Sequence, residues 1–190
     1  ILVKKNAYQF LKNNMEDLDF AFIKYYKPGL LLAKMILKEV KQKKINIIFL
    51  QNHGLIITGN NFYEINKNLN LIIKKNNMLS RSFVFKNNSI ETPNIDMRWP
   101  KYDIINSLAN DPISYKIFKN EKNILYPDQV VYLGKKIFCV ENILEFNQAV
   151  ISKPSFIVYK NVGVLVANSA KPDVEELLQG HAELLLRLNK

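Results

Sequence analysis

The sequence predicts an α/β fold, and three observations support this expectation. Short runs rich in β-branched residues, typical of buried strands, occur at 45–50 and 156–159. Apolar residues recur at helical spacing in 30–43 and 62–78. The chain has 190 residues, 48% of them apolar, which is enough for a real hydrophobic core and argues against wholesale disorder.

The first half of the chain alternates helical and extended patterns. In the segment 30–43, Leu30, Ala33, Leu37 and Val40 share one helical face. Gly59-Asn60-Asn61 supplies a turn and a helix N-cap. The expected elements are a helix at 4–14, a strand at 20–26, a break at Pro28-Gly29, a helix at 30–43, strands at 45–50 and 55–58, and a helix at 62–78.

The second half begins with a mixed stretch and then becomes more regular. Asp111-Pro112 is a helix start signal within 101–120, a stretch that favours short helices. Strand-like runs at 127–133 and 137–140, separated by a Gly134 turn, together predict a hairpin. The remaining expectations are a helix end or strand at 81–85, a loop at 87–93, a helix at 141–151, strands at 156–159 and 164–167, and a last helix that starts near Pro172.

Composition excludes several classes of protein. The net charge of +10 comes almost entirely from lysines mixed with asparagines, and no aromatic–basic stacking motif accompanies them. We therefore interpret the lysines as solvated faces and favour this reading over nucleic-acid binding. No apolar run is long enough to span a membrane, and no signal peptide opens the chain. The single cysteine, Cys139, rules out an internal disulfide, so we expect a cytoplasmic protein.

Two stretches of the chain resemble each other. Each reads as a buried strand, an Asn-x-Gly break, a second strand, a turn and an amphipathic helix. Gly54 and Gly163 occupy matching positions, while His53 in the first copy is matched by Val162 in the second. A purely structural position would not need His in one copy and Val in the other, so the asymmetry suggests a ligand-binding task for His53. The two stretches are 47–59 and 156–168.

Three motifs, in this order, resemble the class II aldolase/adducin family. They are the Tyr25-Tyr26-Lys27-Pro28-Gly29 segment with Leu32-Ala33, the Leu50-Gln51-Asn52-His53-Gly54-Leu55-Ile56 segment with Gly59 and Glu64, and the Leu125-Tyr126-Pro127-Asp128-Gln129-Val130-Val131 segment. The resemblance is best at 18–75 and 123–188. It implies three parts: the C-terminal portion of an aldolase-like domain at 1–86, a helical or loop connection at 87–122, and a C-terminal extension at 123–190 that resembles a second, degenerate strand-turn-strand-helix unit.

The resemblance implies a fold and a chemistry. The fold would be an α/β/α layered arrangement around one largely antiparallel sheet, incomplete at the N-terminus. The parent protein would cleave carbon–carbon bonds of sugar phosphates by a retro-aldol reaction, with zinc or another divalent metal as Lewis acid. Its partners would be a small sugar-phosphate-like substrate and identical subunits, as a homo-oligomer (a tetramer). Related family members act instead as epimerases, dehydratases or decarboxylases.

The resemblance also assigns site residues. His53 matches a metal-ligating histidine, and Tyr25, Asn52 and Gly54 match substrate-binding positions. The family's other two metal histidines form a His-x-His motif, which this sequence lacks, and catalytic zinc needs three ligands and an open position. We therefore expect a fragment of a longer protein that binds no metal tightly and is inactive alone. No catalytic residue is assigned.

Structural roles compete with these assignments. His181 shares a helical face with leucines and is expected to pack in a core. Tyr25 suits a subunit interface, Asp128 suits a turn, Glu64 suits a helix start and Cys139 suits packing. At the level of function, two alternatives stay open. One is a non-catalytic, adducin-like assembly or interaction module, and the other is a basic surface that binds nucleic acid or anionic partners.

Overall fold

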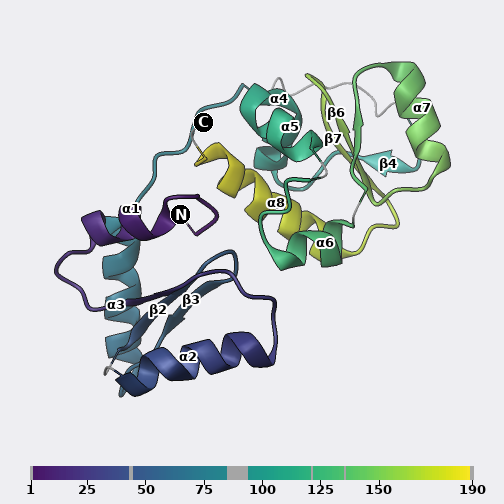
Figure 1. Ribbon diagram of the computed structural model, residues 1–190. Helices are drawn as coiled ribbons and strands as arrows, with labels where there is room; N and C mark the ends of the chain where they lie inside the picture. Colours follow the sequence, from purple (N-terminus) through teal and green to yellow (C-terminus); the bar gives the residue numbers. More distant parts are fainter. Residues whose placement is uncertain (1, 43–44, 85–93, 121, 135, 189–190) are drawn as a thin grey trace. The chain divides into compact units, whose positions relative to one another are not determined.

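The computed structural model describes residues 2–42, 45–84, 94–120, 122–134 and 136–188, which form two compact units. The first unit comprises residues 1–78 and the second residues 79–190. Figure 1 shows the elements of both, and each unit is mixed α/β with its own small sheet. The described part of the expected connection at 87–122 therefore belongs to the second unit, where it contributes a short strand as well as helices. Within the described ranges, no helix is long and apolar enough to cross a membrane.

The first unit is built on a three-stranded sheet with the order β1-β2-β3. Strand β1 pairs in parallel with β2, and β2 pairs antiparallel with β3 across a tight turn. The crossover between the parallel strands is helix α2, as parallel pairing requires. The elements are α1 (Ala7–Asn14), β1 (Ala21–Ile23), α2 (Leu30–Gln42), β2 (Ile47–Leu50), β3 (Gly54–Ile57) and α3 (Phe62–Lys75).

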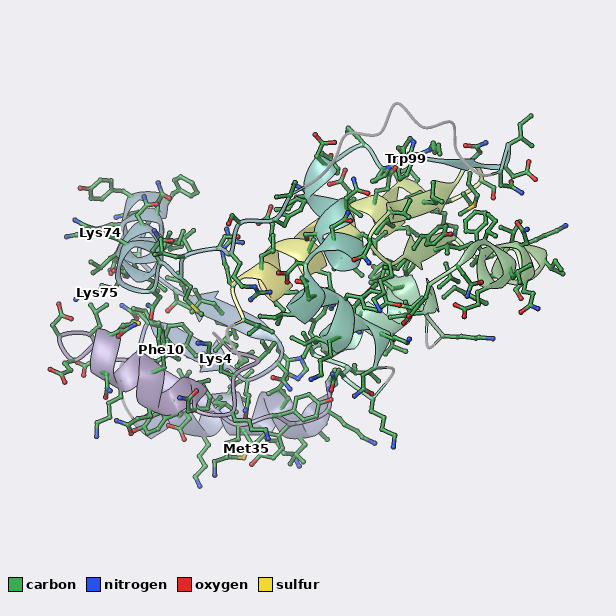
Figure 2. All side chains as sticks on the ribbon, turned by 90° about the horizontal axis from the view of Figure 1, so that it is seen from above. Lys4, Phe10, Met35, Lys74, Lys75 and Trp99 are labelled. Atoms are coloured by element: carbon green, nitrogen blue, oxygen red, sulfur yellow. The ribbon has the colours of Figure 1, made fainter. Side chains whose placement is uncertain are left out.

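Helices cover both faces of this sheet because alternate residues of the fully buried strand β2 point to opposite sides. Ile47 and Phe49 pack with residues of α1 and α3, including Leu11 and Ile72. Ile48 and Leu50 pack on the other face with α2 residues, which include Met35, labelled in Figure 2. At the start of the chain, the Lys4 ammonium lies 5.1 Å from the centroid of the Phe10 ring, and both side chains are labelled in Figure 2.

Helix α2 packs through a different face from the one that its sequence emphasises. Leu32, Met35 and Ile36 contact the core, whereas the residues of the predicted apolar face are exposed. That exposed stripe consists of Leu30, Ala33, Leu37 and Val40. The helix therefore carries apolar residues on two faces, and periodicity alone could not decide which of them meets the sheet.

The second unit has a four-stranded sheet with the order β4-β7-β6-β5. Strand β5 is parallel to β6, while β6–β7 and β7–β4 are antiparallel. The helical elements that precede its parallel pair are η1 (Asp103–Asn106), α4 (Ser107–Asn110), α5 (Pro112–Lys119) and α6 (Pro127–Leu133). The strands and remaining helices are β4 (Met97–Arg98), β5 (Phe138–Val140), α7 (Ile143–Ile151), β6 (Phe156–Tyr159), β7 (Gly163–Ala167) and α8 (Pro172–Leu186).

This sheet too is covered on both faces. Val158 and Val164 face a cluster formed with residues of η1, α4, α5, α6 and α8. Ile157 and Leu165 point the other way, where Phe146 of α7 is fully buried against them. The mixed α/β class expected from the sequence is confirmed, but the described strands form two small sheets and not the one largely antiparallel central sheet that the resemblance implies.

The two units repeat one arrangement: helix, strand, helix, parallel strand, antiparallel strand, helix. Their backbone hydrogen bonds match as well. The Gln51 amide donates to the Ile23 carbonyl over 2.9 Å, and the Lys160 amide donates to the Val140 carbonyl over 2.9 Å. The stretches that resemble each other in sequence therefore fold into corresponding strand-turn-strand-helix segments.

The hairpin predicted at 127–140 is wrong. Residues Pro127–Leu133 form helix α6, and only β5 is a strand, paired in parallel with β6. Pro127 occupies the first turn, where its missing N–H costs nothing, and Asp128 favours the positive helix start. Gly134, with φ 83°, ends the helix in a conformation that suits glycine. Residues 81–84 are neither helix nor strand, and the loop predicted at 87–93 lies outside the described residues.

Candidate functional site

The predicted site residues of the first unit meet at one end of its sheet. Strands β1 and β2 are parallel, so their carboxyl ends, at Ile23 and Leu50, lie at the same edge. The turn between β2 and β3 is at this edge, and so is the segment that leaves β1. In α/β sheets this edge is where ligands commonly bind. We call Tyr25, Tyr26 and residues 51–54 the β2–β3 tip.

The turn itself demands two of the predicted residues. Asn52 has φ 60°, a left-handed conformation that asparagine tolerates, and Gly54 has φ 151°, which side-chain-bearing residues rarely adopt. The second unit repeats this geometry, with Asn161 at φ 59° and Gly163 at φ 155°. Backbone conformation is thus sufficient to explain Asn52 and Gly54, without a substrate-binding role.

His53 is not explained in this way, because the corresponding turn in the second unit accommodates Val162. The amide groups of His53 and Val162 make equivalent bonds, each over 3.0 Å, to the carbonyls of Leu50 and Tyr159. The imidazole of His53 is half-buried, and its Nε2 lies 2.7 Å from the Tyr26 carbonyl oxygen. A carbonyl oxygen only accepts, so Nε2 carries the proton and the lone pair of the neutral ring is on Nδ1.

Two neighbours position this imidazole. The Tyr25 ring is stacked on it, with centroids 5.3 Å apart and planes at 13°. The Tyr25 amide in turn donates to Oε1 of Gln51 over 3.2 Å, so Gln51 fixes the segment that carries both tyrosines. Tyr25 is 46% exposed, which leaves its hydroxyl accessible to a ligand or another subunit. Sequence reasoning missed Gln51, although its place directly after a parallel strand could have indicated it.

The tip does not form a metal centre from the described residues. No group of three or more His, Cys, Asp or Glu side chains able to hold a metal ion is found in the part of the chain that the structure describes. The imidazole is nonetheless arranged as one ligand would be, because metal-binding histidines usually donate their other ring N–H to a carbonyl or carboxylate. The residues present therefore fit a single ligand position and not a complete site.

The other singled-out residues have structural roles. His181 is 1% exposed, and its Nδ1 lies 2.8 Å from the Tyr126 hydroxyl. Burial lowers the pKa of His181 to about 4, so the ring is neutral at physiological pH. Glu64 accepts hydrogen bonds from Asn60 while its own amide donates to Asn61 at the start of α3, Asp128 lies in the first turn of α6, and Cys139 lies in β5.

The second unit has a feature at its corresponding tip that sequence reasoning did not find. Helix α5 and the β6–β7 turn line a cavity of about 520 Å³ with three lysines, Lys116, Lys119 and Lys160. Lys160 is distant in sequence from Lys116 and Lys119, and lysines are spread along the whole chain, so these three resembled solvated surface charges.

In comparisons with known proteins, no family model, no curated protein and no solved structure matches this chain. The function is therefore inferred from the residues of the site.

Proposed function

We propose that this chain is part of a class II aldolase-like protein of sugar or sugar-phosphate metabolism, in which His53 supplies one ligand of a divalent-metal site. The observation that carries the proposal is the hydrogen bond from His53 Nε2 to the Tyr26 carbonyl, which leaves the Nδ1 lone pair for a metal. Among the described residues, no hydrogen bond involves Nδ1 of this ring.

The internal repeat supports a ligand role for the histidine. The same turn forms with Val162, so His53 is not required by the backbone. Since an aliphatic side chain can occupy this position of the turn, we attribute the imidazole to ligand binding and not to folding. Zinc or another divalent cation is the proposed ligand, since neutral imidazole suits such metals.

The described residues assign no catalytic step to this chain. A catalytic zinc usually has three protein ligands, and His53 alone cannot replace them. The remaining ligands would come from further sequence of a parent protein or from a second subunit. Metal-dependent retro-aldol cleavage is therefore proposed for the parent, in a cytoplasmic setting, and this chain alone should show no cleavage.

Paramagnetic metal titration tests the role of His53, since the chain has only two histidines. Added Co²⁺ should broaden the imidazole resonances of His53 and leave those of the buried His181 unchanged. Binding should be weak and readily reversed by a chelator, because one imidazole is the only ligand at the tip among the described residues. His53→Ala should abolish the effect, whereas broadening that persists in this variant would remove His53 from the proposed site.

Activity separates the aldolase assignment from simple metal binding. The parent protein should release the aldol fragments from fuculose-1-phosphate or rhamnulose-1-phosphate, and His53→Ala should reduce its metal content and cleavage together. A parent that binds metal through His53 but cleaves neither compound would contradict the aldolase assignment and keep the metal site.

A non-catalytic assembly module is the second candidate, and the exposed stripe on α2 favours it. Leu30 is 72% exposed, Leu37 56% and Val40 44%. With Ala33 they follow the three-four-three spacing of a coiled-coil seam. The proposed occupant is the same helix of a second copy.

Salt dependence identifies this assembly. Lys34, Lys38 and Lys41 flank the stripe, so two copies repel each other and association should strengthen as salt screens the lysines. Light scattering should detect salt-promoted oligomers that Leu37→Lys prevents. A monomer at every salt concentration would exclude this candidate.

A further inference from the structure

The cavity at the tip of the second unit has the size and lining of a ligand site. Its volume of about 520 Å³ lies within the range of small-molecule pockets. Ala109 and Pro112 give it an apolar wall, and Tyr115 and the aliphatic stems of lysines extend that wall. The lining residues are Ala109, Pro112, Tyr115, Lys116, Lys119, Asn120, Lys160 and Asn161.

The cavity is strongly positive even after its own ion pairs are considered. Lys119 and Lys160 both bind Glu141, at 2.8 Å and 3.1 Å. Hydrogen bonds from these two lysines lower the pKa of Glu141 to about 2, so this carboxylate is ionised at neutral pH. It can compensate only one of the three ammonium groups around the cavity. Lys116 makes no ion pair within the described residues, and about two positive charges remain.

The charged groups are held on a fixed framework. The Asn161 amide donates to the Ala109 carbonyl over 3.0 Å, which ties the β6–β7 turn to α4. Tyr115 is 6% exposed, and the Lys119 and Lys160 ammonium groups lie 5.7 Å and 5.6 Å from its ring centroid. Both lysines are thus oriented by the same ring and the same carboxylate.

The position in the fold is also that of a ligand site. Glu141 directly follows β5, and Lys160 directly follows β6, the two parallel strands of the sheet. The cavity therefore lies at the carboxyl edge of the parallel pair, as the β2–β3 tip does in the first unit. The repeated framework places different chemistry at its two tips: an imidazole at the first and ammonium groups at the second.

We propose that this cavity binds a small phosphate monoester, with the phosphate contacting Lys116 and the Lys119–Lys160 pair and the organic group lying against Ala109 and Pro112. A phosphate monoester carries a charge of about −1.5 to −2 at neutral pH, which matches the positive charge left in the cavity. The cavity is larger than a phosphate ion needs, so the organic group contributes contacts of its own. This site is independent of the metal site proposed at His53.

Phenyl phosphate, inorganic phosphate and phenol test the proposal on the intact chain. Amide resonances of Lys160 and Asn161 should shift with phenyl phosphate, which should bind more tightly than inorganic phosphate. Phenol should have no effect, since it lacks the charge. Equal binding of the two phosphates would reduce the site to a simple anion contact and overturn the role given to the apolar wall.

Matched lysine substitutions separate a site from a general positive surface. Lys116→Met leaves the Glu141 ion pairs intact and should weaken phenyl phosphate binding roughly tenfold. Lys67→Met removes the same charge from an exposed position on α3 of the other unit and should change nothing. Equal weakening by both substitutions, or no resonance shift in the unsubstituted chain, would overturn the proposal, because the lysines would then be only a surface charge network.

Discussion

Gly54 and Gly163 both have positive φ angles, but their surroundings leave different amounts of space for a side chain. A Cβ added to Gly54 would meet no atom within 4 Å, so only the backbone conformation opposes a side chain there. A Cβ added to Gly163 would lie 2.6 Å from Oδ1 of Asn106 and 2.8 Å from the Trp99 ring. The same Asn106 oxygen accepts a hydrogen bond of 2.9 Å from the Val164 amide, so it cannot move away without loss.

Alanine at these two positions should therefore have unequal effects. Gly54→Ala should destabilise the first unit by about 1–2 kcal/mol through backbone strain alone. Gly163→Ala should cost the second unit more, about 3 kcal/mol or above, since strain and overpacking add. Hydrogen exchange of amides in β3 and β7 measures each loss locally. Equal losses would mean that the contact with Asn106 and Trp99 relaxes freely.

The buried His181 makes the second unit sensitive to acid. Burial lowers its pKa from 6.5 to about 4. Between pH 6.5 and pH 4, His181 is therefore protonated in the unfolded chain and neutral in the folded chain. Stability is complete above pH 6.5 and falls as pH decreases toward 4, by about 3 kcal/mol in all. Its neighbour Tyr126 does not titrate here, because burial raises the pKa of that hydroxyl to about 12.

Urea unfolding followed by Trp99 fluorescence checks this dependence, since Trp99 is the single tryptophan and belongs to the second unit. The decrease in the free energy of unfolding between pH 6.5 and 4.5 should disappear in His181→Gln. Below that window the carboxyl groups of Asp111 and Glu175, whose pKa values are lowered, add a loss of their own. A slope that survives in the variant would have another origin.

At the scale of elements, the helix starts that carry a local signal were predictable. Asp111 accepts from the Ser114 amide and caps α5, and Asn61 and Asn142 cap α3 and α7 in the same way. Helix α6 was misassigned because Pro127-Asp128 suits a turn before a strand as well as a helix start. The packing face of α2 could not be predicted, since both faces are apolar and the choice depends on the sheet.

Arg81 joins elements that the sequence does not connect. Its guanidinium donates to the carbonyls of Leu185 and Leu188 at the end of α8 and lies 2.6 Å from the Asp111 carboxylate, which caps α5. Although burial raises the pKa of Asp111, hydrogen bonds from Arg81 and Ser114 hold it below its usual value. The carboxylate is therefore ionised and depends on this arginine.

Arg81→Met should destabilise the second unit by about 2–4 kcal/mol, because Asp111 is 7% exposed and would be left as a buried, unpaired charge. Arg187→Met is the matched control. Arg187 pairs with Glu183 at 3.7 Å on the surface, where the loss should be below about 0.5 kcal/mol. Chemical denaturation of both variants gives the comparison, and similar midpoints would show that Arg81 contributes no more to stability than a surface ion pair.

At the scale of the whole molecule, the repeat was predictable from the two Asn-x-Gly segments. Their Asn and Gly positions have φ near 60° and 150°, which restricts the residue types that can occupy them. The division at Met78 was not, since no proline- or glycine-rich linker marks it. The turn at 51–54 could be inferred because its residues are contiguous in sequence, whereas Tyr25 and Tyr26 lie beside it through the parallel pairing of β1 and β2. The lysine cavity could not be inferred, because it forms only when α5 packs beside the distant β6–β7 turn.

Separate cores predict separate unfolding. Each unit has its own sheet and its own buried clusters, the conditions under which a domain unfolds as a unit. Trp99, labelled in Figure 2, reports only on the second unit, whereas far-ultraviolet circular dichroism reports on the helices of both. The two signals should therefore not coincide along a urea titration.

Core truncations in each unit make this prediction decisive. Leu11 and Leu178 are both 0% exposed, one in each unit, and replacing either with alanine should cost about 2–5 kcal/mol. Leu11→Ala should shift only the part of the circular dichroism transition that belongs to the first unit and leave Trp99 fluorescence unchanged. Leu178→Ala should shift the fluorescence transition. If each substitution moved both signals equally, the chain would unfold as one cooperative structure, because the stability of each core would then depend on the other.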